Sequence, residues 1–370
     1  MKNVLFIHSS SELYGSDRSL LYIIKNLDKS KYNVYVILPY HGPLVNEMRE
    51  LDNVHIEIFK VAVLRRKNLS FIGAISYFRD FIFSVSYLKK SIRKYEIDIV
   101  DTNTAVVFPG AIAAKYCKVK NIWHIREIIS NNVENKIISS IMNRYADLIV
   151  ANSKETGKAL RINSNKIRVI YNAVEENPKT NVIPHEQLTV GMAGRINRWK
   201  GQKLFVDAAK IVHQKKPEVL FKIAGDVYEG EEHLKSELLE HIDRQNLTNT
   251  VLLLGQIDNM PEFYRCIDIF ILPSIQPEPF GLVVIEAMEY GVPVIATNHG
   301  GPTEIIENGI DGFLVDYQKP DQMAECILKL IMNEKKRREI GINGQKKKRQ
   351  KFSVNTMVTH IENIFEEIST

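Results

Sequence analysis

Residues 267–288 read Ile-Asp-Ile-Phe-Ile-Leu-Pro-Ser-Ile-Gln-Pro-Glu-Pro-Phe-Gly-Leu-Val-Val-Ile-Glu-Ala-Met. The apolar run at 267–272 predicts a strand, the three prolines that follow predict a loop, and a stretch with helical period opens near Gly281. A nearly continuous apolar strand is typical of a parallel sheet that is covered on both faces. This strand–loop–helix unit therefore indicates an α/β fold.

The same alternation of short apolar runs and amphipathic stretches continues in both directions along the chain. We expect two facing, doubly wound Rossmann-like domains at residues 1–172 and 188–352, with a polar linker at 173–187 and an interdomain cleft. The C-terminal helix, 353–370, is expected to pack back on the first domain. The expected strands are Val4–His8, Tyr35–Leu38, Val54–Phe59, Ile97–Asp101, Asn121–His124, Leu148–Ala151 and Ile167–Ile170, then Leu188–Ala193, Val219–Ala224, Val251–Leu254, Ile267–Leu272, Val292–Ala296 and Gly312–Val315.

The composition argues against a nucleic-acid-binding protein, a metalloprotein and a membrane-spanning protein. The formal net charge of the 370 residues is +5, which indicates a mildly cationic surface, and no nucleic-acid partner is expected. Cys117, Cys266 and Cys326 lie far apart without zinc-type spacing, as expected of reduced thiols in the cytoplasm and of a protein without a metal site. The most apolar stretch, Phe71 to Leu88, is interrupted by Arg79-Asp80, so no transmembrane helix is expected.

Three cations, of which Arg195 and Lys200 are the candidates, follow the first strand of the second domain in Gly194-Arg195-Ile196-Asn197-Arg198-Trp199-Lys200-Gly201. Arg195 and Lys200 would stand at the carboxyl end of a strand and beside a helix N-terminus, where a diphosphate would meet a guanidinium, an ammonium and free backbone amides. Such cations stabilise the charge that accumulates on a departing phosphate. The alternative interpretation is a solvated basic turn.

Two glutamates mark the 267–288 segment as a second part of the site. Glu278 lies in the loop, and Glu286 is flanked by apolar residues inside the helix. A carboxylate in such surroundings needs hydrogen-bonding partners, which ribose hydroxyls supply. An internal ion pair is the alternative for Glu286.

These motifs resemble those of the retaining nucleotide-sugar glycosyltransferases of family 4, which have the GT-B fold. The resemblance lies in G-R-x4-K-G, E-P-F-G-L-V-V-I-E-A-M and the following Gly-Val-Pro-Val-Ile-Ala-Thr, and it spans essentially the whole chain. It implies that Arg195 and Lys200 hold the donor diphosphate, that Glu286 binds the ribose and that Glu278 binds the donor sugar. It further implies donor contacts from Gly15, Gly194, Phe280, Gly281, Leu282 and Val283, and contacts to the base from 170–172 and 255–257.

The N-terminal half offers weaker candidates. The resemblance implies that His124, at a strand end, touches the donor sugar, although a lone histidine there is often only hydrogen-bonded. Asp17, Asn103 and Arg126 are candidates for the acceptor side. The carboxylate of Asp17 could instead cap a helix, and Arg126 could pair with its neighbour Glu127.

The resulting hypothesis is a metal-independent hexosyltransferase that uses a front-face, retaining mechanism and requires no cofactor. The resemblance favours a UDP-sugar donor and a glycan or polyprenyl-linked acceptor, in cell-surface polysaccharide or glycolipid biosynthesis. A sugar-nucleotide epimerase of the same architecture and a non-catalytic sugar-nucleotide-binding subunit are alternatives. An NAD enzyme is disfavoured because no G-x-G-x-x-G follows either first strand.

Peripheral contact with an anionic membrane, on its inner face, is a further hypothesis. It rests on basic clusters at 65–67, 89–90, 93–94, 335–338 and 346–349, the first ones flanking an aromatic-rich amphipathic stretch. Packing of that stretch against the sheet is the competing interpretation.

Overall fold

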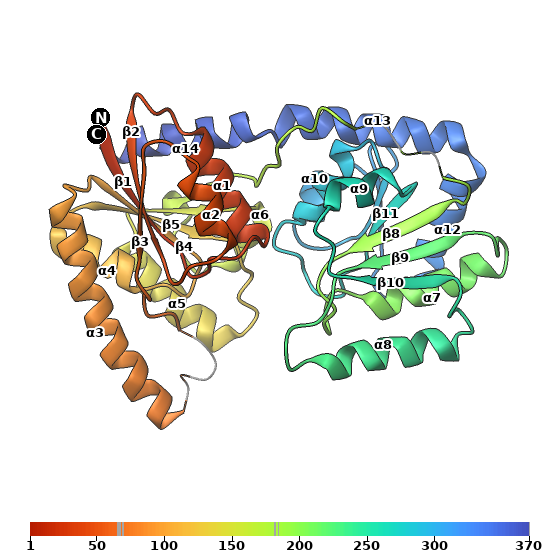
Figure 1. Ribbon diagram of the computed structural model, residues 1–370, viewed down its shortest axis with the longest axis horizontal. Coiled ribbons are helices and arrows are strands. Elements are labelled where there is room, and N and C mark those ends of the chain that lie inside the picture. The colour runs from red at the N-terminus through yellow and green to blue at the C-terminus, as the bar shows by residue number, and fades with distance from the viewer. Residues whose placement is uncertain (65–67, 69, 181–182, 184, 370) are drawn as a thin grey trace. The chain divides into compact units, whose positions relative to one another are not determined.

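The computed structural model describes residues 1–64, 68, 70–180, 183 and 185–369, and the chain divides into two compact units (Figure 1). Unit 1 comprises Met1–Ala173 and Val354–Thr370, and unit 2 comprises Val174–Ser353. Each unit is built on one sheet in which every paired strand is parallel. The predicted fold class, two doubly wound parallel-sheet domains, is confirmed.

The sheet of unit 1 has the order β3-β2-β1-β4-β5-β6-β7. Its first strand contains Val4, Leu5, Phe6 and Ile7, all of them buried, because helices cover both faces of the sheet. The strands are β1 (Lys2–Ile7), β2 (Tyr32–Leu38), β3 (Val54–Ile58), β4 (Ile99–Asn103), β5 (Lys120–Ile125), β6 (Leu148–Ala151) and β7 (Ile167–Val169).

Helices from both ends of the chain cover the sheet of unit 1. One face packs against α1, α2 and α14, and the other packs against α3 and α4. The last helix joins the first core because the ring of Phe365 is buried between Phe6 and Tyr32. The helices are α1 (Gly15–Asn26), α2 (Pro43–Arg49), α3 (Phe71–Lys94), α4 (Pro109–Cys117), α5 (Asn132–Tyr145), α6 (Lys154–Ala159), the 3-10 helix η2 (Ser164–Lys166) and α14 (Val354–Ser369).

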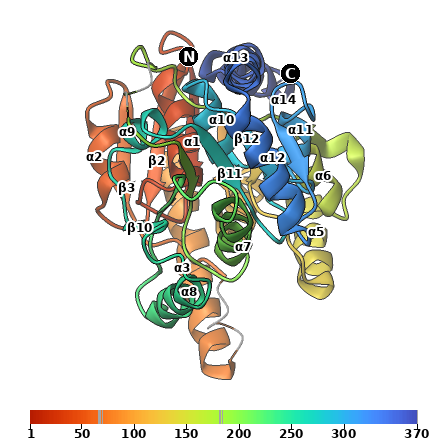
Figure 2. The same ribbon diagram turned by 90° about the vertical axis from the view of Figure 1, so that its right-hand side faces the viewer.

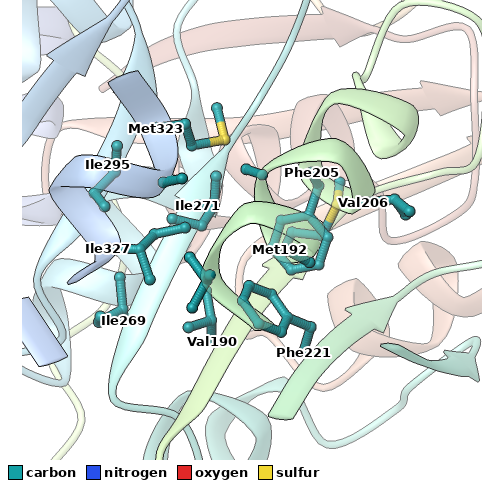
Figure 3. Close-up of a cluster of buried hydrophobic side chains, with 14 of the residues drawn as sticks. Val190, Met192, Phe205, Val206, Phe221, Ile269, Ile271, Ile295, Met323 and Ile327 are labelled. Carbon is teal, nitrogen blue, oxygen red and sulfur yellow. The ribbon is translucent and has the colours of Figure 1, made fainter. Parts of the chain in front are cut away.

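Unit 2 repeats this plan with the order β10-β9-β8-β11-β12-β13. Its main core lies between the sheet and α7, α8 and α12, and Figure 3 shows Val190, Met192, Phe221 and Ile327 in it. Helices α7 and α12 pack side by side over the sheet (Figure 2). The strands are β8 (Thr189–Ala193), β9 (Leu220–Ala224), β10 (Val251–Gly255), β11 (Ile269–Leu272), β12 (Val294–Thr297) and β13 (Phe313–Val315). The helices are α7 (Gln202–His213), α8 (Glu232–Arg244), α9 (Met260–Arg265), α10 (Leu282–Glu289), α11 (Pro302–Ile305), α12 (Pro320–Met332) and α13 (Glu334–Lys351).

The basic clusters near the C-terminus lie in a helix and are partly buried, which differs from the prediction of an exposed surface. Residues 335–338 and 346–349 belong to α13, a highly charged helix that the apolar pattern does not predict. Lys348 is buried with its ammonium 2.6 Å from Glu289, and Lys347 lies 2.6 Å from Asp311. These two cations are held in ion pairs inside unit 2, so the prediction that the 346–349 cluster contacts a membrane is wrong for them. The cluster at 65–67 lies outside the described residues.

Within the described ranges, none of the helices combines the length and the apolar character that a membrane span needs.

Candidate active site

Each sheet reverses its strand order beside its first strand, between β1 and β4 in unit 1 and between β8 and β11 in unit 2. Open parallel sheets bind ligands at such points, at the carboxyl ends of the strands. In unit 2, the loops that leave β8 and β11 contain both predicted cations and Glu278.

The loop from β8 to α7 is fixed by local hydrogen bonds that direct Lys200. The side-chain oxygen of Asn197 accepts from the backbone N–H groups of Trp199, at 3.1 Å, and Lys200, at 2.9 Å. The carbonyl oxygen of Trp199 accepts from the N–H of Ile275, which ties this loop to the one after β11. Gly201, the residue before α7, has a φ of +77°, and a Cβ there would clash with a backbone carbonyl of the neighbouring loop.

Lys200 and Glu278 meet although 78 positions separate them in the sequence. The ammonium nitrogen of Lys200 is 2.9 Å from both carboxylate oxygens of Glu278, and the Ser274 hydroxyl donates to Oε2 at 2.9 Å. The N–H of Gly301 donates to the carbonyl of Glu278 at 2.7 Å. The two side chains are only 16% and 10% exposed, so their attraction is weakly screened by solvent. This pair fixes an ammonium and a carboxylate at the switch point of the sheet.

Arg195 stands at the start of the same loop, next to Gly194. Its guanidinium carbon lies 3.3 Å from the centre of the Tyr228 ring, and its carbonyl accepts from the side-chain amide of Gln202 at 2.9 Å. Stacking on an aromatic face restrains the orientation of a guanidinium. Gly194 has a φ of +150°, a backbone conformation that L side chains rarely adopt.

The loop after β11 leads into α10 through Gly281, whose φ is +94°. Among the described residues no side chain caps this end, so the first N–H groups of the helix, at Leu282 and Val283, are left to other acceptors. The ring of Phe280 is buried against Phe352, with 5.9 Å between the ring centres. Phe280 can therefore offer a ligand its backbone but not its ring.

Glu286 lies one turn further along α10 and is half-buried. Its Oε2 accepts a hydrogen bond of 2.7 Å from the hydroxyl of Tyr264 on α9. This contact with a neutral hydroxyl orients the carboxylate, whose oxygens are acceptors of the kind that ribose hydroxyls need.

At the corresponding edge of unit 1, Asp17 is buried and engaged on both sides. One carboxylate oxygen is 2.6 Å from Nε2 of His8, and the other accepts from the N–H of Tyr14 at 2.9 Å. The structure thus gives Asp17 a capping role at the start of α1. Gly15, the first residue of that helix, is exposed.

His124 and Asn103 are both buried at the ends of β5 and β4. Asn103 is the last residue of β4 rather than part of the loop that was expected to follow it. Its side-chain amide donates to Asp101 at 2.9 Å, and Nδ1 of His124 lies 3.2 Å from the same Asp101 oxygen, too poorly directed for a hydrogen bond. Contact of His124 with a donor sugar stays a prediction.

Arg126 is the centre of the polar cluster in unit 1. Its Nη1 donates to the hydroxyl of Ser19 at 2.7 Å and to the side-chain oxygen of Asn172 at 2.6 Å, and its Nε lies 3.4 Å from Asn103. Burial lowers the pKa of Arg126 and raises the pKa of the adjacent Glu127 carboxyl. Glu127 accepts instead from the N–H groups of Ala105 and Arg126, both at 3.2 Å.

Sequence reasoning missed several partners that position these groups. Ser274, Ser19 and Tyr228 are ordinary surface residue types whose roles depend on contacts made across the fold. Asp101 did carry a signal, because a carboxylate that directly follows the apolar pair Ile99-Val100 in a predicted strand needs a buried polar partner.

Two sequence families match the chain, one for each half. Residues 14–177 match "Glycosyltransferase Family 4", and residues 173–347 match "Glycosyl transferases group 1". The chain is similar to an uncharacterized glycosyltransferase of Methanocaldococcus jannaschii, with 30% identity over 76% of this chain and 78% of the relative.

Two further relatives match over more of the chain. The UDP-Gal:alpha-D-GlcNAc-diphosphoundecaprenol alpha-1,3-galactosyltransferase of Escherichia coli is 26% identical over 90% of both chains. HepE of Anabaena, solved in complex with UDP and glucose, superimposes with a TM-score of 0.83 over 99% of this chain and all of HepE, at 26% identity. With two matching parallel-sheet domains, the chain therefore belongs to the family 4 glycosyltransferases and has their GT-B fold.

Proposed function

We propose that this glycosyltransferase moves a hexose from a UDP-sugar to a glycan or polyprenyl-linked acceptor, with retention of anomeric configuration and without a metal. The relatives support the donor and acceptor classes, because HepE was solved with UDP and the enzyme of Escherichia coli is named for UDP-Gal and a diphosphoundecaprenol-linked acceptor. The corresponding process is cell-surface polysaccharide or glycolipid biosynthesis, on the cytoplasmic side of a membrane.

The observation that carries the proposal is the Lys200–Glu278 pair at the β8/β11 switch point. Glu278 holds the ammonium where a donor diphosphate would lie, beside the first amides of α10 and the loop that contains Arg195. The same carboxylate can accept hydrogen bonds from hydroxyls of the transferred sugar. Lys200 would thus contact the diphosphate and Glu278 the sugar, the two groups joined by the bond that breaks.

In the proposed reaction, the bond between the anomeric carbon and the β-phosphate oxygen breaks, and its electrons go to the leaving UDP. The acceptor oxygen forms its bond to the same face of the sugar, and the proton of the acceptor hydroxyl passes to a donor phosphate oxygen. Lys200 and Arg195 stabilise the charge that develops on the diphosphate. Glu286, oriented by Tyr264, binds the ribose.

Charge neutralisation by these two side chains supports the proposal of metal independence, because divalent ions perform that task in other transferases. Sugar transfer assayed with excess EDTA should proceed at the untreated rate. Loss of transfer with EDTA and its recovery on adding Mg²⁺ or Mn²⁺ would refute this part of the proposal.

The central test replaces Lys200 with methionine, which keeps the length of the side chain and removes its charge. We expect kcat/KM to fall by a factor of about 10²–10³, or ~3–4 kcal/mol of transition-state stabilisation. Lys203→Met is the matched control, because Lys203 is an exposed cation on the first turn of α7 that pairs with Glu237. We expect the control to stay within roughly twofold of wild type, as for surface substitutions.

Thermal unfolding of both variants shows whether they are folded. Turnover of Lys200→Met within about tenfold of wild type would remove the mechanism as drawn. A thermal-shift panel of nucleotide sugars identifies the donor, since a ligand that binds the folded protein raises the melting temperature further the more its concentration exceeds its Kd.

A further inference from the structure

Helix α3 presents a row of large apolar side chains to solvent. Ile72, Ile75, Phe78, Ile82 and Phe83 are all between 52% and 80% exposed. The first four follow one another at three or four residues, and Phe83 comes eleven residues, about three turns, after Ile72, so all five lie on one side of the helix. Scattered exposed apolar residues are ordinary, but a contiguous set on one face marks an interaction site.

The opposite side of α3 already supplies the contacts that the fold requires. Ser84, Leu88 and Ile92 are buried, and Tyr77 and Phe81 pack against a core that includes residues of α4 and α5. Packing against the rest of unit 1 therefore accounts for one face of α3 and leaves the apolar outer face unexplained. Figure 1 shows α3 as a long helix at the margin of unit 1.

The charge of α3 indicates what the outer face contacts. Lys90 and Arg93 are exposed and continue the same stripe, eight and eleven residues after Ile82. The last three turns also contain Lys89 and Lys94, whereas the one acidic residue of the helix, Asp80, lies 3.1 Å from Arg79. The outer face thus carries the exposed apolar side chains together with Arg79 over its first half, and it is cationic over its second.

We propose that the outer face of α3, defined by Ile72, Ile75, Phe78, Ile82, Phe83, Lys90 and Arg93, docks on an anionic lipid bilayer. The isoleucines and phenylalanines enter the boundary between headgroups and acyl chains, and Lys90 and Arg93 contact lipid phosphates. This deepens the proposed function by naming the surface that holds the enzyme where a lipid-linked acceptor lies. The docking itself rests only on the exposure and charge of α3.

The test is flotation of the full-length protein with vesicles of phosphatidylcholine alone or mixed with phosphatidylglycerol. We expect binding to the mixed vesicles at low salt and weaker binding at high salt, because the electrostatic part is screened. Phe78→Ser/Ile82→Ser and Lys90→Glu/Arg93→Glu should each lower the partition coefficient by about tenfold or more. The matched control is Leu239→Ser/Ile342→Ser, two exposed apolar residues of unit 2, which should leave binding unchanged.

Equal vesicle binding by wild type and both α3 variants would overturn the proposal. The proposal would also be overturned if the wild-type protein bound no vesicles but ran as a dimer on size-exclusion chromatography, and if Phe78→Ser/Ile82→Ser ran as a monomer. The outer face of α3 would then bind a second copy of the chain. Donor-induced thermal shifts are measured on the same samples. Binding of UDP-sugar without binding of lipid would refute the docking proposal alone. Binding of lipid without binding of UDP-sugar would refute the proposed function alone.

Discussion

The Lys200–Glu278 pair shows how much a single contact adds to what residue types imply. A lysine after a strand and a glutamate in a proline-rich loop each have an ordinary surface interpretation. Their approach to 2.9 Å, with the Ser274 hydroxyl on the same carboxylate, makes the solvated-turn alternative untenable for Lys200. The ammonium is held in place before any donor arrives, and such preorganisation is what makes electrostatic stabilisation effective.

His185 provides a test of electrostatics at the same scale. Burial by itself lowers the pKa of His185, but hydrogen bonds to Asp268 and to the carbonyl of Ile183 outweigh burial and leave the pKa above 6.5. Both ring nitrogens face acceptors, at 2.7 and 2.8 Å, so the doubly protonated ring fits the site best. Folding therefore favours the protonated form.

The stabilisation by His185 should be fully present below pH 6.5 and should disappear as the pH rises through the higher folded-state pKa. We expect His185→Gln to lower the free energy of unfolding by up to ~1 kcal/mol at pH 6, because the pair is partly exposed, and by less at pH 8.5. Urea denaturation at both pH values measures the difference. The control is His233→Gln, which changes an exposed histidine of α8 and should not cause this pH-dependent loss of stability. A difference in stability between wild type and His185→Gln that grows with pH would show that folding does not favour protonated His185.

At the scale of elements, glycines decide how closely the loops of unit 2 can approach. Gly300 lies beside Glu278 in a short bridge, and a Cβ there would overlap the Glu278 backbone. The β12–α11 connection thus packs against the backbone of Glu278, whose carboxylate belongs to the candidate site. Gly291 has the same φ of +67° but has open space where a Cβ would stand.

Gly300→Ala and Gly291→Ala separate these two effects. Both variants should lose ~1–2 kcal/mol of stability from the left-handed backbone. Gly300→Ala should lose a further ~1–3 kcal/mol from overpacking, and its kcat/KM should fall because Glu278 is displaced. Urea denaturation and transfer kinetics measure the two quantities, and equal behaviour of the variants would show that contact with Glu278 is unimportant.

At the scale of the whole molecule, the chain leaves unit 1 after residue 173 and returns to it at residue 354. The returning helix, α14, completes the core of unit 1, because Val358, Ile361 and Phe365 join the cluster around β1 and α1. Unit 1 is therefore complete only when the last residues of the chain have folded onto the first.

We expect Phe365→Ala to destabilise unit 1 by ~3–5 kcal/mol, since it removes a buried ring that contacts Phe6 and Tyr32. Phe83→Ala, which removes an exposed ring of the same unit, should change stability by no more than about 0.5 kcal/mol. Thermal unfolding followed by circular dichroism compares the two. A loss for Phe365→Ala no greater than that for Phe83→Ala would show that α14 is dispensable.

The elements that the sequence predicts well are those whose pattern is local. Strands such as β6 and β8 are short apolar runs bounded by polar residues, and the structure places them within a residue of the prediction. Helix α13 lacks such a local pattern. In α13 the helical signal is hidden, because buried Ile340 and Gly341 stand among many charged residues, and buried Lys348 contacts Glu289 through tertiary structure.

The sequence by itself determined the fold class and the segments that carry the candidate site, because burial on both faces of a parallel sheet and the loops at strand ends leave local patterns. Only the tertiary structure decided that Lys200 meets Glu278, that Tyr264 orients Glu286 and that Lys348 is buried. Those outcomes depend on pairs of residues far apart in the chain. Their contact energies arise only after the chain has folded, so no local pattern contains them.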